Sequence, residues 1–527
     1  MEYDAVIVGG GIAGLTAAAY LTKSGISTLL CEQAEYCGGL VNSFERDGFT
    51  YDGGIRGMEN SGALFPMLKQ LGLHIEFVKN NISLGIEDRV IRITSEENLL
   101  DYQELLVDLY PESKSEILAI VDQIKQIMYY MEVQYGIDNP MFLDLKTDRE
   151  YMLKEILPWV FKYALTVRKI SALDQPVVPF LKKFTQNQRL VDIIAQHFFH
   201  DTPTFFALSY IHLYLDYYYP LGGTGTVVNE LIRLIERHDG IIRTKTRITQ
   251  VDPERRFVVD SEGNRFGYRR LIWAADQKTL YRQINTEKIE SQKIKTAVEH
   301  RRQQIEDKIG NDSIFSLFVG ADLPPSYFSD IASEHFFYTP SREGETAAGP
   351  LPLGKDRPAV EAWLKAFFAR TTFEVGIPAL RDPSLAPPGK TGLIISVLFD
   401  YRLAKQIEDQ GWYQEFKTLC EELMIDTLDG SIYPGIKNAV LHRFSATPLT
   451  FESLTGNTHG AITGWAFSNN PLPAESRLPR ILNAIRTPIP GILQAGQWTY
   501  SPSGLPISLI TGKMAADRVI KSLSKSR

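Results

Sequence analysis

The sequence has few cysteines, no long apolar run and no excess of basic charge, and each shortage excludes a class of protein. Its three cysteines, Cys31, Cys37 and Cys420, form no CxxC pair and no metal-ligand spacing. We therefore expect no disulfide framework, no metal site and a reducing compartment. Cys31 and Cys37 could form a redox pair, but the favoured interpretation is two small buried residues beside a turn. The formal net charge of −7 argues against a nucleic-acid-binding protein.

Targeting and membrane-spanning signals are also missing from the sequence. The first predicted strand begins at Tyr3, before a basic signal-peptide region could fit. No run of about eighteen uncharged apolar residues occurs. We expect a cytoplasmic protein that could still be peripheral on a membrane. At 527 residues the chain is too long for one ordinary domain, and it has no repeats or low-complexity segments.

A phosphate-binding turn is predicted at the N-terminus. An apolar run over 3–8 is typical of a buried parallel strand, and it leads into Gly9-Gly10-Gly11-Ile12-Ala13-Gly14. Gly9 permits the tight turn, Gly11 admits a pyrophosphate, and Gly14 lets the helix expected over 15–23 pack on the strand. The phosphates would lie at the N-terminus of that helix, beside Ile12 and Ala13.

The residues that follow bear on which nucleotide is bound. Glu32 ends a second predicted strand about 20 positions after Gly11, where an acid binds ribose hydroxyls, and Gln33 follows it. This fingerprint alone fits either NAD or FAD. Two further glycine turns exceed what an ADP half needs and therefore favour FAD. They supply the candidate cofactor-binding residues Gly38, Gly39, Leu40, Asp52, Gly54, Ile55 and Arg56.

Four separated segments resemble the flavin-containing amine oxidase superfamily, and within it the phytoene desaturase, carotenoid isomerase and retinol saturase group. The first is Gly9–Asp52, and the second is Tyr219–Gly225 with the helix and strand that follow it. The resemblance implies that Ile248 on that strand bonds the adenine through its backbone. The third is Leu271–Asp276, in which Ala274 replaces the usual Asn.

The fourth segment is Gly491–Trp498, continuing through Gly504–Ala516. The resemblance implies that a strand end and a helix N-terminus contact the flavin here, through Gly496, Gln497, Leu505, Pro506 and Ile507. Gln497 stands where Asp is common. A helix N-terminus at this place would stabilise the negative charge of reduced flavin. The segment Thr455–Trp465 is more similar to the isomerase and saturase branch than to amine oxidases.

The fold class implied by the resemblance is α/β, with a discontinuous Rossmann-type FAD-binding domain over 1–95, 215–285 and 455–527. An inserted α+β substrate domain would occupy 96–214 and 286–454 and carry a helical region. Apolar residues recur at helical spacing within 101–214, as at Ile117, Ile120 and Val121, whereas 314–319 and 393–399 are strand-like runs.

The implied function is that of an FAD-dependent oxidoreductase acting on carbon–carbon bonds of a long apolar isoprenoid, carotenoid-like or other lipid substrate. The reaction would be desaturation, saturation or cis-trans isomerisation. A flavin amine oxidase and a non-catalytic protein that binds flavin or prenyl lipid are the alternatives. Arg56 and Glu59 are catalytic candidates expected near the flavin ring, and His459 is a candidate proton donor. A structural ion pair between Arg56 and Glu59, and a structural His459, are the simpler interpretations.

Two aromatic stretches bear on the substrate and on a membrane. The predicted helix over 155–170 combines aromatic and basic residues, as interfacial helices do, or it packs on its own domain. The pairs Phe198-Phe199 and Phe205-Phe206 and the run Tyr214–Tyr219 could line an apolar tunnel or belong to the core.

Overall fold

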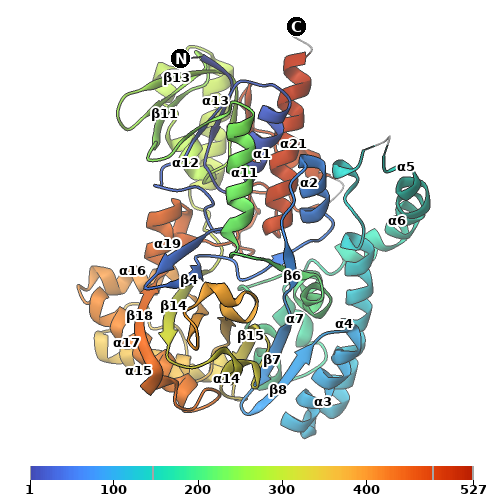
Figure 1. Cartoon of the computed structure of the whole chain (residues 1–527), viewed down its shortest axis with the longest axis vertical. Helices are drawn as coiled ribbons and strands as arrows, with labels where there is room; N and C mark the ends of the chain where they lie inside the picture. Colours follow the sequence, from blue (N-terminus) through green and yellow to red (C-terminus); the bar gives the residue numbers. More distant parts are fainter. Residues whose placement is uncertain (1, 145–146, 478–479, 525–527) are drawn as a thin grey trace.

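A computed structural model describes residues 2–144, 147–477 and 480–524 of the protein. Two large sheets lie toward opposite ends of the molecule, and both chain termini lie at the end of the first sheet (Figure 1). Short strands connect the two ends: β3 (Ser43–Arg46), β4 (Phe49–Asp52), β5 (Met58–Glu59), β6 (Phe77–Lys79) and β9 (Tyr217–Pro220).

The first sheet contains the predicted nucleotide-binding strands. Its members are β1 (Glu2–Val8), β2 (Thr28–Cys31), β10 (Ile241–Arg243), β11 (Ile248–Asp252), β12 (Phe257–Asp260), β13 (Arg265–Trp273) and β19 (Ile492–Gln494). The strand order is β10-β2-β1-β13-β12-β11, and β19 also pairs with β13. The pairs among β10, β2, β1, β13 and β19 are parallel, whereas β11, β12 and β13 form an antiparallel meander. This sheet therefore draws on three distant parts of the chain, as expected of a discontinuous Rossmann-type fold.

Helices cover both faces of the first sheet, as its buried parallel strands require. On one face α1 (Ile12–Lys23) contacts both α11 (Gly225–Arg237) and α21 (Leu505–Ser524). On the other face lie α12 (Gln277–Arg282) and α13 (Gln292–Ile305). Alternate side chains of β1 enter the two cores, with Ala5 and Ile7 on the α1 side and Val6 and Val8 on the α12 side.

The second sheet lies at the opposite end. Its strands are β7 (Ile82–Ile86), β8 (Arg89–Ile93), β14 (Ser313–Ala321), β15 (His335–Thr339), β16 (Phe373–Gly376), β17 (Thr391–Phe399) and β18 (Val440–Ala446). The order is β18-β14-β17-β16-β15-β7-β8, and β15–β7 is the parallel pair. One face shares a core with α15 (Arg357–Phe368), α16 (Tyr401–Asp409) and α17 (Tyr413–Asp429). The two strand-like runs of the sequence lie in β14 and β17.

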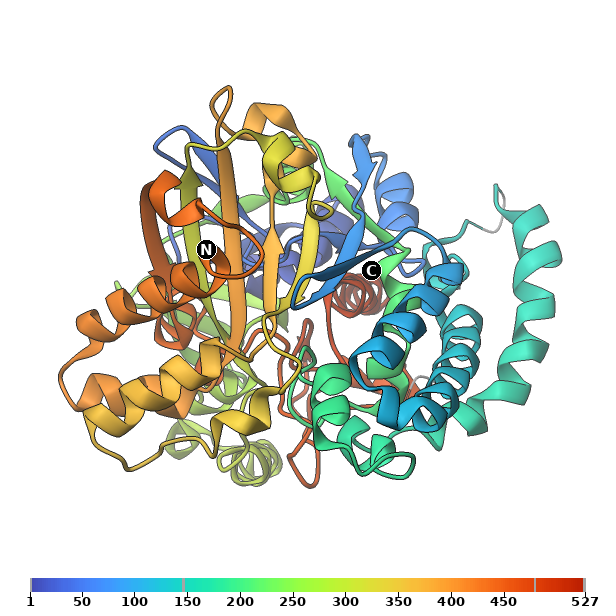
Figure 2. The ribbon, with the colours of Figure 1, turned by 90° about the horizontal axis from the view of Figure 1, so that it is seen from below.

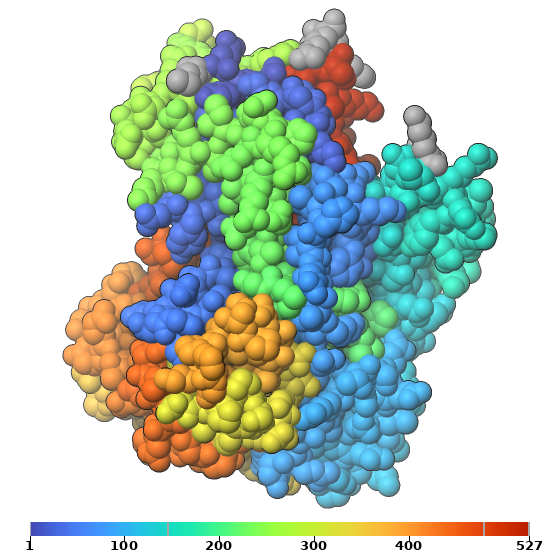
Figure 3. All heavy atoms as spheres, in the orientation of Figure 1, coloured from blue at the N-terminus to red at the C-terminus, as the bar shows by residue number. Residues whose placement is uncertain are grey.

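Residues 101–214 are mainly helical, as predicted. The helices are α3 (Leu99–Leu109), α4 (Lys114–Tyr135), α5 (Arg149–Tyr151), α6 (Leu157–Ser171), α7 (Val177–Leu181), α8 (Gln188–Ala195), α9 (Thr204–Leu208) and α10 (Tyr210–Tyr214). Helix α6 stands at the edge of the molecule (Figure 2), and the segment around it, in teal, bulges from the body in the space-filling view (Figure 3). The remaining helices are α2 (Leu64–Leu71), α14 (Pro325–Ser329), α18 (Ile436–Ala439), α19 (Pro448–Thr455) and α20 (Ile481–Ala484).

Two segments differ from the expected domain limits. Residues 82–93, expected in the first domain, form β7 and β8 of the second sheet, because β7 pairs with β15 in continuous register. Helix α13, expected in the substrate domain, packs on the first sheet through Val298 and Ile305. The division into two domains itself stays a prediction.

Candidate functional site

A cavity of about 460 Å³ extends from the first sheet to the second. At one end it is lined by the turn after β1, the end of β2 and the start of β11. Its middle is lined by the loop after β19 and by the first turn of α21. Its inner end is lined by residues near α8 to α10 and by strands of the second sheet. The cavity therefore joins the predicted nucleotide site to the predicted substrate side.

The glycine turn after β1 shapes the nucleotide end. Gly9 has a φ of 104°, and a Cβ there would lie 2.5 Å from the carbonyl oxygen of Ala274. A Cβ at Gly11 would meet no atom within 4 Å, because it would project into open space at the start of α1. An anion such as a pyrophosphate fits this arrangement, because free backbone N–H groups and the helix dipole meet at a helix N-terminus.

Glu32 lies at the end of β2 and lines the same end of the cavity. Its Oε2 accepts a hydrogen bond from the backbone N–H of Gly10 at 2.6 Å, and its Oε1 accepts one from Ala34 at 2.8 Å. The carboxylate is thereby fixed beside the glycine turn, where it could accept ribose hydroxyls. Cys31 also lines the cavity; burial raises the pKa of its thiol to about 12, so a reactive thiolate is disfavoured.

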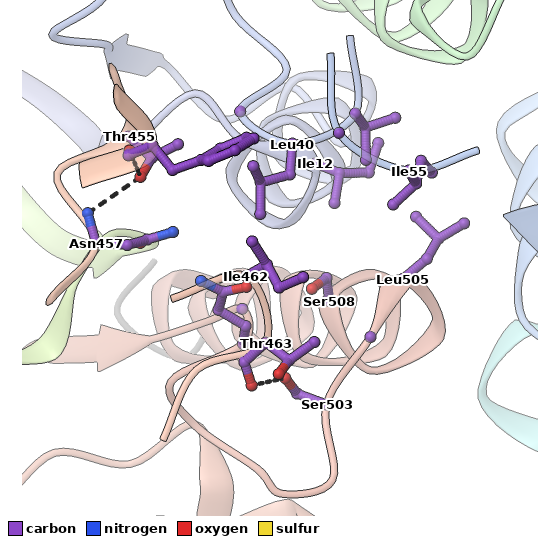
Figure 4. Close-up of a pocket in the computed structure, with 18 of the residues that line it drawn as sticks. Ile12, Leu40, Ile55, Thr455, Asn457, Ile462, Thr463, Ser503, Leu505 and Ser508 are labelled. Carbon is purple, nitrogen blue, oxygen red and sulfur yellow. Dashed lines mark hydrogen bonds between the residues drawn. The ribbon is translucent and has the colours of Figure 1, made fainter. Parts of the chain in front are cut away.

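The structure brings most of the predicted cofactor-binding residues together. Those that line the cavity are Gly9, Gly11, Ile12, Ala13, Glu32, Gln33, Gly38, Gly39, Leu40, Gly54, Ile55, Arg56, Ile248, Ala274, Gly496, Gln497 and Leu505. Figure 4 shows Ile12 and Leu40 facing Ile462 across the cavity, with Ser508 of α21 beside it. The first turn of α21 therefore opens onto the middle of the cavity.

Five predicted site residues do not line the cavity. Gly14 is a packing position, because a Cβ there would lie 2.0 Å from the carbonyl oxygen of Gly9. Pro506 and Ile507 are buried in α21, whereas Leu505 and Ser508 face the cavity. The other two, Asp52 and His459, have structural partners.

Asp52 holds two loops together instead of facing the cavity. Its Oδ1 accepts from the hydroxyl of Ser43 at 2.8 Å and from the backbone N–H of Thr224 at 2.9 Å. Its Oδ2 accepts from the hydroxyl of Tyr219 at 2.8 Å. Asp52 thus ties β4 to the turn at Tyr219–Gly225, and its predicted contact with the cofactor stays a prediction.

His459 is a turn residue with a φ of 61°. Its backbone N–H donates to Oε1 of Glu452 at 3.2 Å, and its ring lies 4.9 Å from that of Tyr401, measured between centroids. His459 does not line the cavity, although Asn457 and Ile462 do, and its role as a proton donor stays a prediction.

Arg56 and Glu59 both line the cavity, and they form no ion pair with each other in the described structure. Arg56 is 3% exposed and donates to Oγ of Ser396 at 2.5 Å and to the carbonyl oxygen of Gly54. Burial and the nearby charge of Asp216 raise the pKa of Glu59 to about 7, although a hydrogen bond from Tyr217 opposes the shift. Glu59 is therefore poised to exchange a proton near neutral pH.

Aromatic side chains form much of the inner wall. Phe199, Phe206 and Tyr217, which belong to stretches singled out in the sequence, line the cavity, whereas Phe198 and Phe205 are buried in the core. The structure adds Tyr210 and Phe337 to this wall. This end is therefore suited to an apolar molecule.

His335 and Glu374 also line the inner end, and sequence reasoning missed both. The Nε2 of His335 lies 2.9 Å from Oε1 of Glu374. Burial alone would raise the pKa of Glu374, but the hydrogen bond with His335 and the charges of Arg56 and Arg381 outweigh it and lower that pKa. The sequence does contain a signal for Glu374, because this glutamate stands between two apolar residues of a strand, Phe373 and Val375.

Comparisons with known proteins agree with this geometry. Residues 7–71 match a family model described as an NAD(P)-binding Rossmann-like domain. Prolycopene isomerase 2 (chloroplastic) of an Oncidium hybrid cultivar is 23% identical, over 99% of this chain and 84% of the relative. Phytoene desaturase (lycopene-forming) of Pseudescherichia vulneris is 22% identical, over 98% of this chain and 99% of the relative.

A solved structure of a putrescine oxidase variant shares the fold, with a TM-score of 0.61, 14% identity and 99% of both chains covered. The molecule is thus an α/β protein with a Rossmann-type nucleotide site. The resemblance to the phytoene desaturase and carotenoid isomerase group, stated from the sequence, is confirmed.

Proposed function

We propose that this chain is an FAD-dependent oxidoreductase that acts on carbon–carbon bonds of a long apolar isoprenoid or carotenoid-like substrate. The observation that carries the proposal is the single cavity that continues from the Rossmann turn, past the N-terminus of α21, to an aromatic inner wall. An ADP moiety bound at the Rossmann turn would leave the other end empty, whereas the ribityl chain and ring system of FAD would extend further along this path.

The residues present fit FAD. Gly11 leaves space for the pyrophosphate, Glu32 is placed for the ribose, and Ile248 borders the adenine end. Gly496, Gln497 and Leu505 border the place where the flavin ring would lie, beside the N-terminus of α21. Bound there, the flavin would supply two-electron redox chemistry, and the protein would bind, orient and tune it. We propose that the buried cation of Arg56 balances negative charge at this place.

The substrate side is supported by the inner wall and by the relatives. Tyr210, Tyr217 and Phe337 offer apolar faces to a polyene. The relatives are named for prolycopene and phytoene, which are such molecules. Whether the reaction is desaturation, saturation or isomerisation depends on the substrate that is accepted.

An amine oxidase is the second candidate, because the fold is shared with putrescine oxidase and an ionised carboxylate, Glu374, lies in the cavity. The aromatic side chains of the inner wall suit an isoprenoid better than a short diamine.

We also propose that α6 contacts a membrane surface as a peripheral element. No helix among residues 2–144, 147–477 and 480–524 is long and apolar enough to cross a membrane. Helix α6 exposes Leu157, Phe161 and Leu165, the last at 78%. Lys162 and Arg168 flank this stripe, as in helices that lie in the headgroup region of anionic lipids.

The experiment that tests the proposed function uses protein reconstituted with FAD, once oxidised and once reduced with dithionite, and offered prolycopene, phytoene, all-trans-retinol and putrescine in parallel. We expect a change in the polyene, followed by chromatography, and no hydrogen peroxide with putrescine. Peroxide release with putrescine and unchanged polyenes would instead establish the amine oxidase. Bound FAD that leaves all four compounds unchanged in both its oxidised and its reduced form would favour a non-catalytic binding protein.

A further inference from the structure

Two carboxylates lie at the inner end of the cavity in contrasting surroundings. Glu59 comes from β5 and Glu374 from β16. Glu59 faces the acid Asp216 and the hydroxyl of Tyr217, and no cation pairs with it among the described residues. Glu374 faces His335 and two arginines, Arg56 and Arg381. The first environment favours the neutral acid, and the second favours the carboxylate.

The hydrogen bonds around His335 determine how Glu374 is held. Nδ2 of Asn80 lies 3.2 Å from Nδ1 of His335, and an amide nitrogen can only donate. Nδ1 therefore accepts, and Nε2 of the neutral ring carries the proton that it donates to Oε1 of Glu374. Burial lowers the pKa of His335, so the neutral ring is the stable form.

Arg381 fixes the other end of this chain of hydrogen bonds. Its Nε donates to Oδ1 of Asn80 at 2.7 Å, which orients the amide with its nitrogen toward His335. In this chain of hydrogen bonds Arg381 therefore donates to Asn80, Asn80 to His335, and His335 to Glu374. Oε2 of Glu374 receives no hydrogen bond from the described residues and is available to the cavity. Such outer partners set the orientation and charge of a reactive group.

Tyr210 and Tyr217 lie within the electrostatic reach of both carboxylates. Burial raises the pKa of each phenol, and the charges of Glu59 and Glu374 both add to the shift. The ring of Tyr217 lies 6.1 Å from that of His335. An apolar chain lying against the rings of Tyr210 and Tyr217 would therefore lie near both carboxyl groups, one favoured as the neutral acid and the other as the carboxylate.

We propose that Glu59 and Glu374 divide the chemistry of the site, Glu59 transferring the proton and Glu374 remaining ionised to stabilise positive charge on the substrate. The inference rests on the proposed function. In desaturation, a substrate C–H bond would break with its electron pair leaving as hydride, and bound FAD would supply the two-electron acceptor. The adjacent carbon then loses a proton to ionised Glu59, and that C–H pair forms the double bond.

The same division serves the other directions of reaction. In saturation, neutral Glu59 would give its proton to one carbon of the double bond, and Glu374 would stabilise the neighbouring cationic carbon until it received hydride, which reduced flavin would supply. In isomerisation, rotation about a bond of the cation occurs between hydride loss and hydride return. Each case passes through a cation beside Glu374, and opposite charges attract strongly where water is excluded.

The first test measures binding of a cation and needs no turnover. The probe is decyltrimethylammonium, an apolar chain with a fixed positive charge, and 1-decanol is the uncharged control. Each is titrated by calorimetry at about pH 6 into the FAD-loaded wild type, Glu374→Gln and Glu59→Gln. We expect binding of the cation to be about tenfold weaker in Glu374→Gln and nearly unchanged in Glu59→Gln. Decanol should bind all three proteins equally. Equal affinity of wild type and Glu374→Gln for the cation would overturn the assignment.

The second test uses the pH dependence of turnover with whichever polyene reacts. Glu59 is faced by Asp216, Tyr217, Tyr210 and Tyr135. We expect a rate inflection near pH 7 in wild type that Glu59→Gln loses and Glu374→Gln keeps at a lower rate. An inflection that persists in Glu59→Gln would contradict its role. FAD binding is measured first. If no FAD is bound, the proposed function fails, and the cation titration repeated on the FAD-free proteins then judges Glu374 alone.

Discussion

At the scale of single residues, the inner end of the cavity depends on Gly57, because its neighbours occupy the space of a side chain there. A Cβ at Gly57 would lie 2.3 Å from Nδ2 of Asn80 and 3.1 Å from Cδ1 of Tyr217. The amide that orients His335 and the phenol beside Glu59 therefore both occupy space that any other residue at 57 would fill. The geometry of the two carboxylates follows from this close packing.

Gly57→Ala should therefore damage the site more than the fold. We expect turnover to fall ~10-fold or more, because misplacing a positioning group by about 1 Å is costly. Rates are compared at equal FAD content. Gly430→Ala is the matched control, since its nearest neighbour, the carbonyl oxygen of Asp426, lies 3.2 Å from the added Cβ at the distant end of α17. Equal rates in the two variants would contradict the argument.

Glu59 should also make stability depend on pH. Its pKa is raised to about 7 in the folded protein. The neutral side chain therefore adds to the free energy of unfolding below its ordinary pKa, and this stabilisation is lost as the pH rises through 7. The shift corresponds to about 3 kcal/mol at most. Glu59→Gln should therefore gain thermal stability relative to wild type between about pH 5 and about pH 8. A constant difference in unfolding temperature would exclude burial of the neutral acid.

At the scale of elements, α6 differs from the other helices because its apolar residues face outward. Thr166 is its buried residue, while Phe161 and Leu165 are 67% and 78% exposed. The ring of Trp159 stacks on that of Tyr163, with centroids 5.1 Å apart, and its indole donates to the carbonyl oxygen of Val133. The helix is thus fixed to α4 by one face and offers the opposite face to a partner.

The pair of substitutions Phe161→Ser and Leu165→Ser should weaken binding to phosphatidylglycerol vesicles at least ~10-fold, because each apolar side chain contributes about 1.5–3 kcal/mol when buried. Vesicle sedimentation at low salt measures this. Ile241→Ser with Leu441→Ser is the control pair, since both residues are exposed apolar positions away from α6. If the two double variants bind vesicles equally, α6 is not the lipid-contacting element.

At the scale of the whole molecule, the sequence predicted the nucleotide end far better than the inner end. Gly9, Gly11 and Glu32 could be predicted because a strand, a turn and a helix adjoin in the chain and constrain one another locally. His335 and Glu374 could not, because they meet only when β15 pairs with β16, which places His335 opposite Gly376. Asp52 and His459 do not line the cavity, which the sequence could not show, since their partners, Thr224 and Glu452, are known only from the folded chain.

The central claim is that FAD occupies the cavity with its pyrophosphate against Gly11, and the most direct test compares wild type with Gly11→Val. The added side chain projects into open space and meets no protein atom within 4 Å of the Cβ position, so the fold should be unaffected while the pyrophosphate site is filled. We expect wild type to show the visible absorption of bound flavin after FAD is added and the excess removed. Gly11→Val should have the same circular dichroism and no flavin absorption. A wild type that takes up no FAD, or a variant that binds it equally well, would contradict the account.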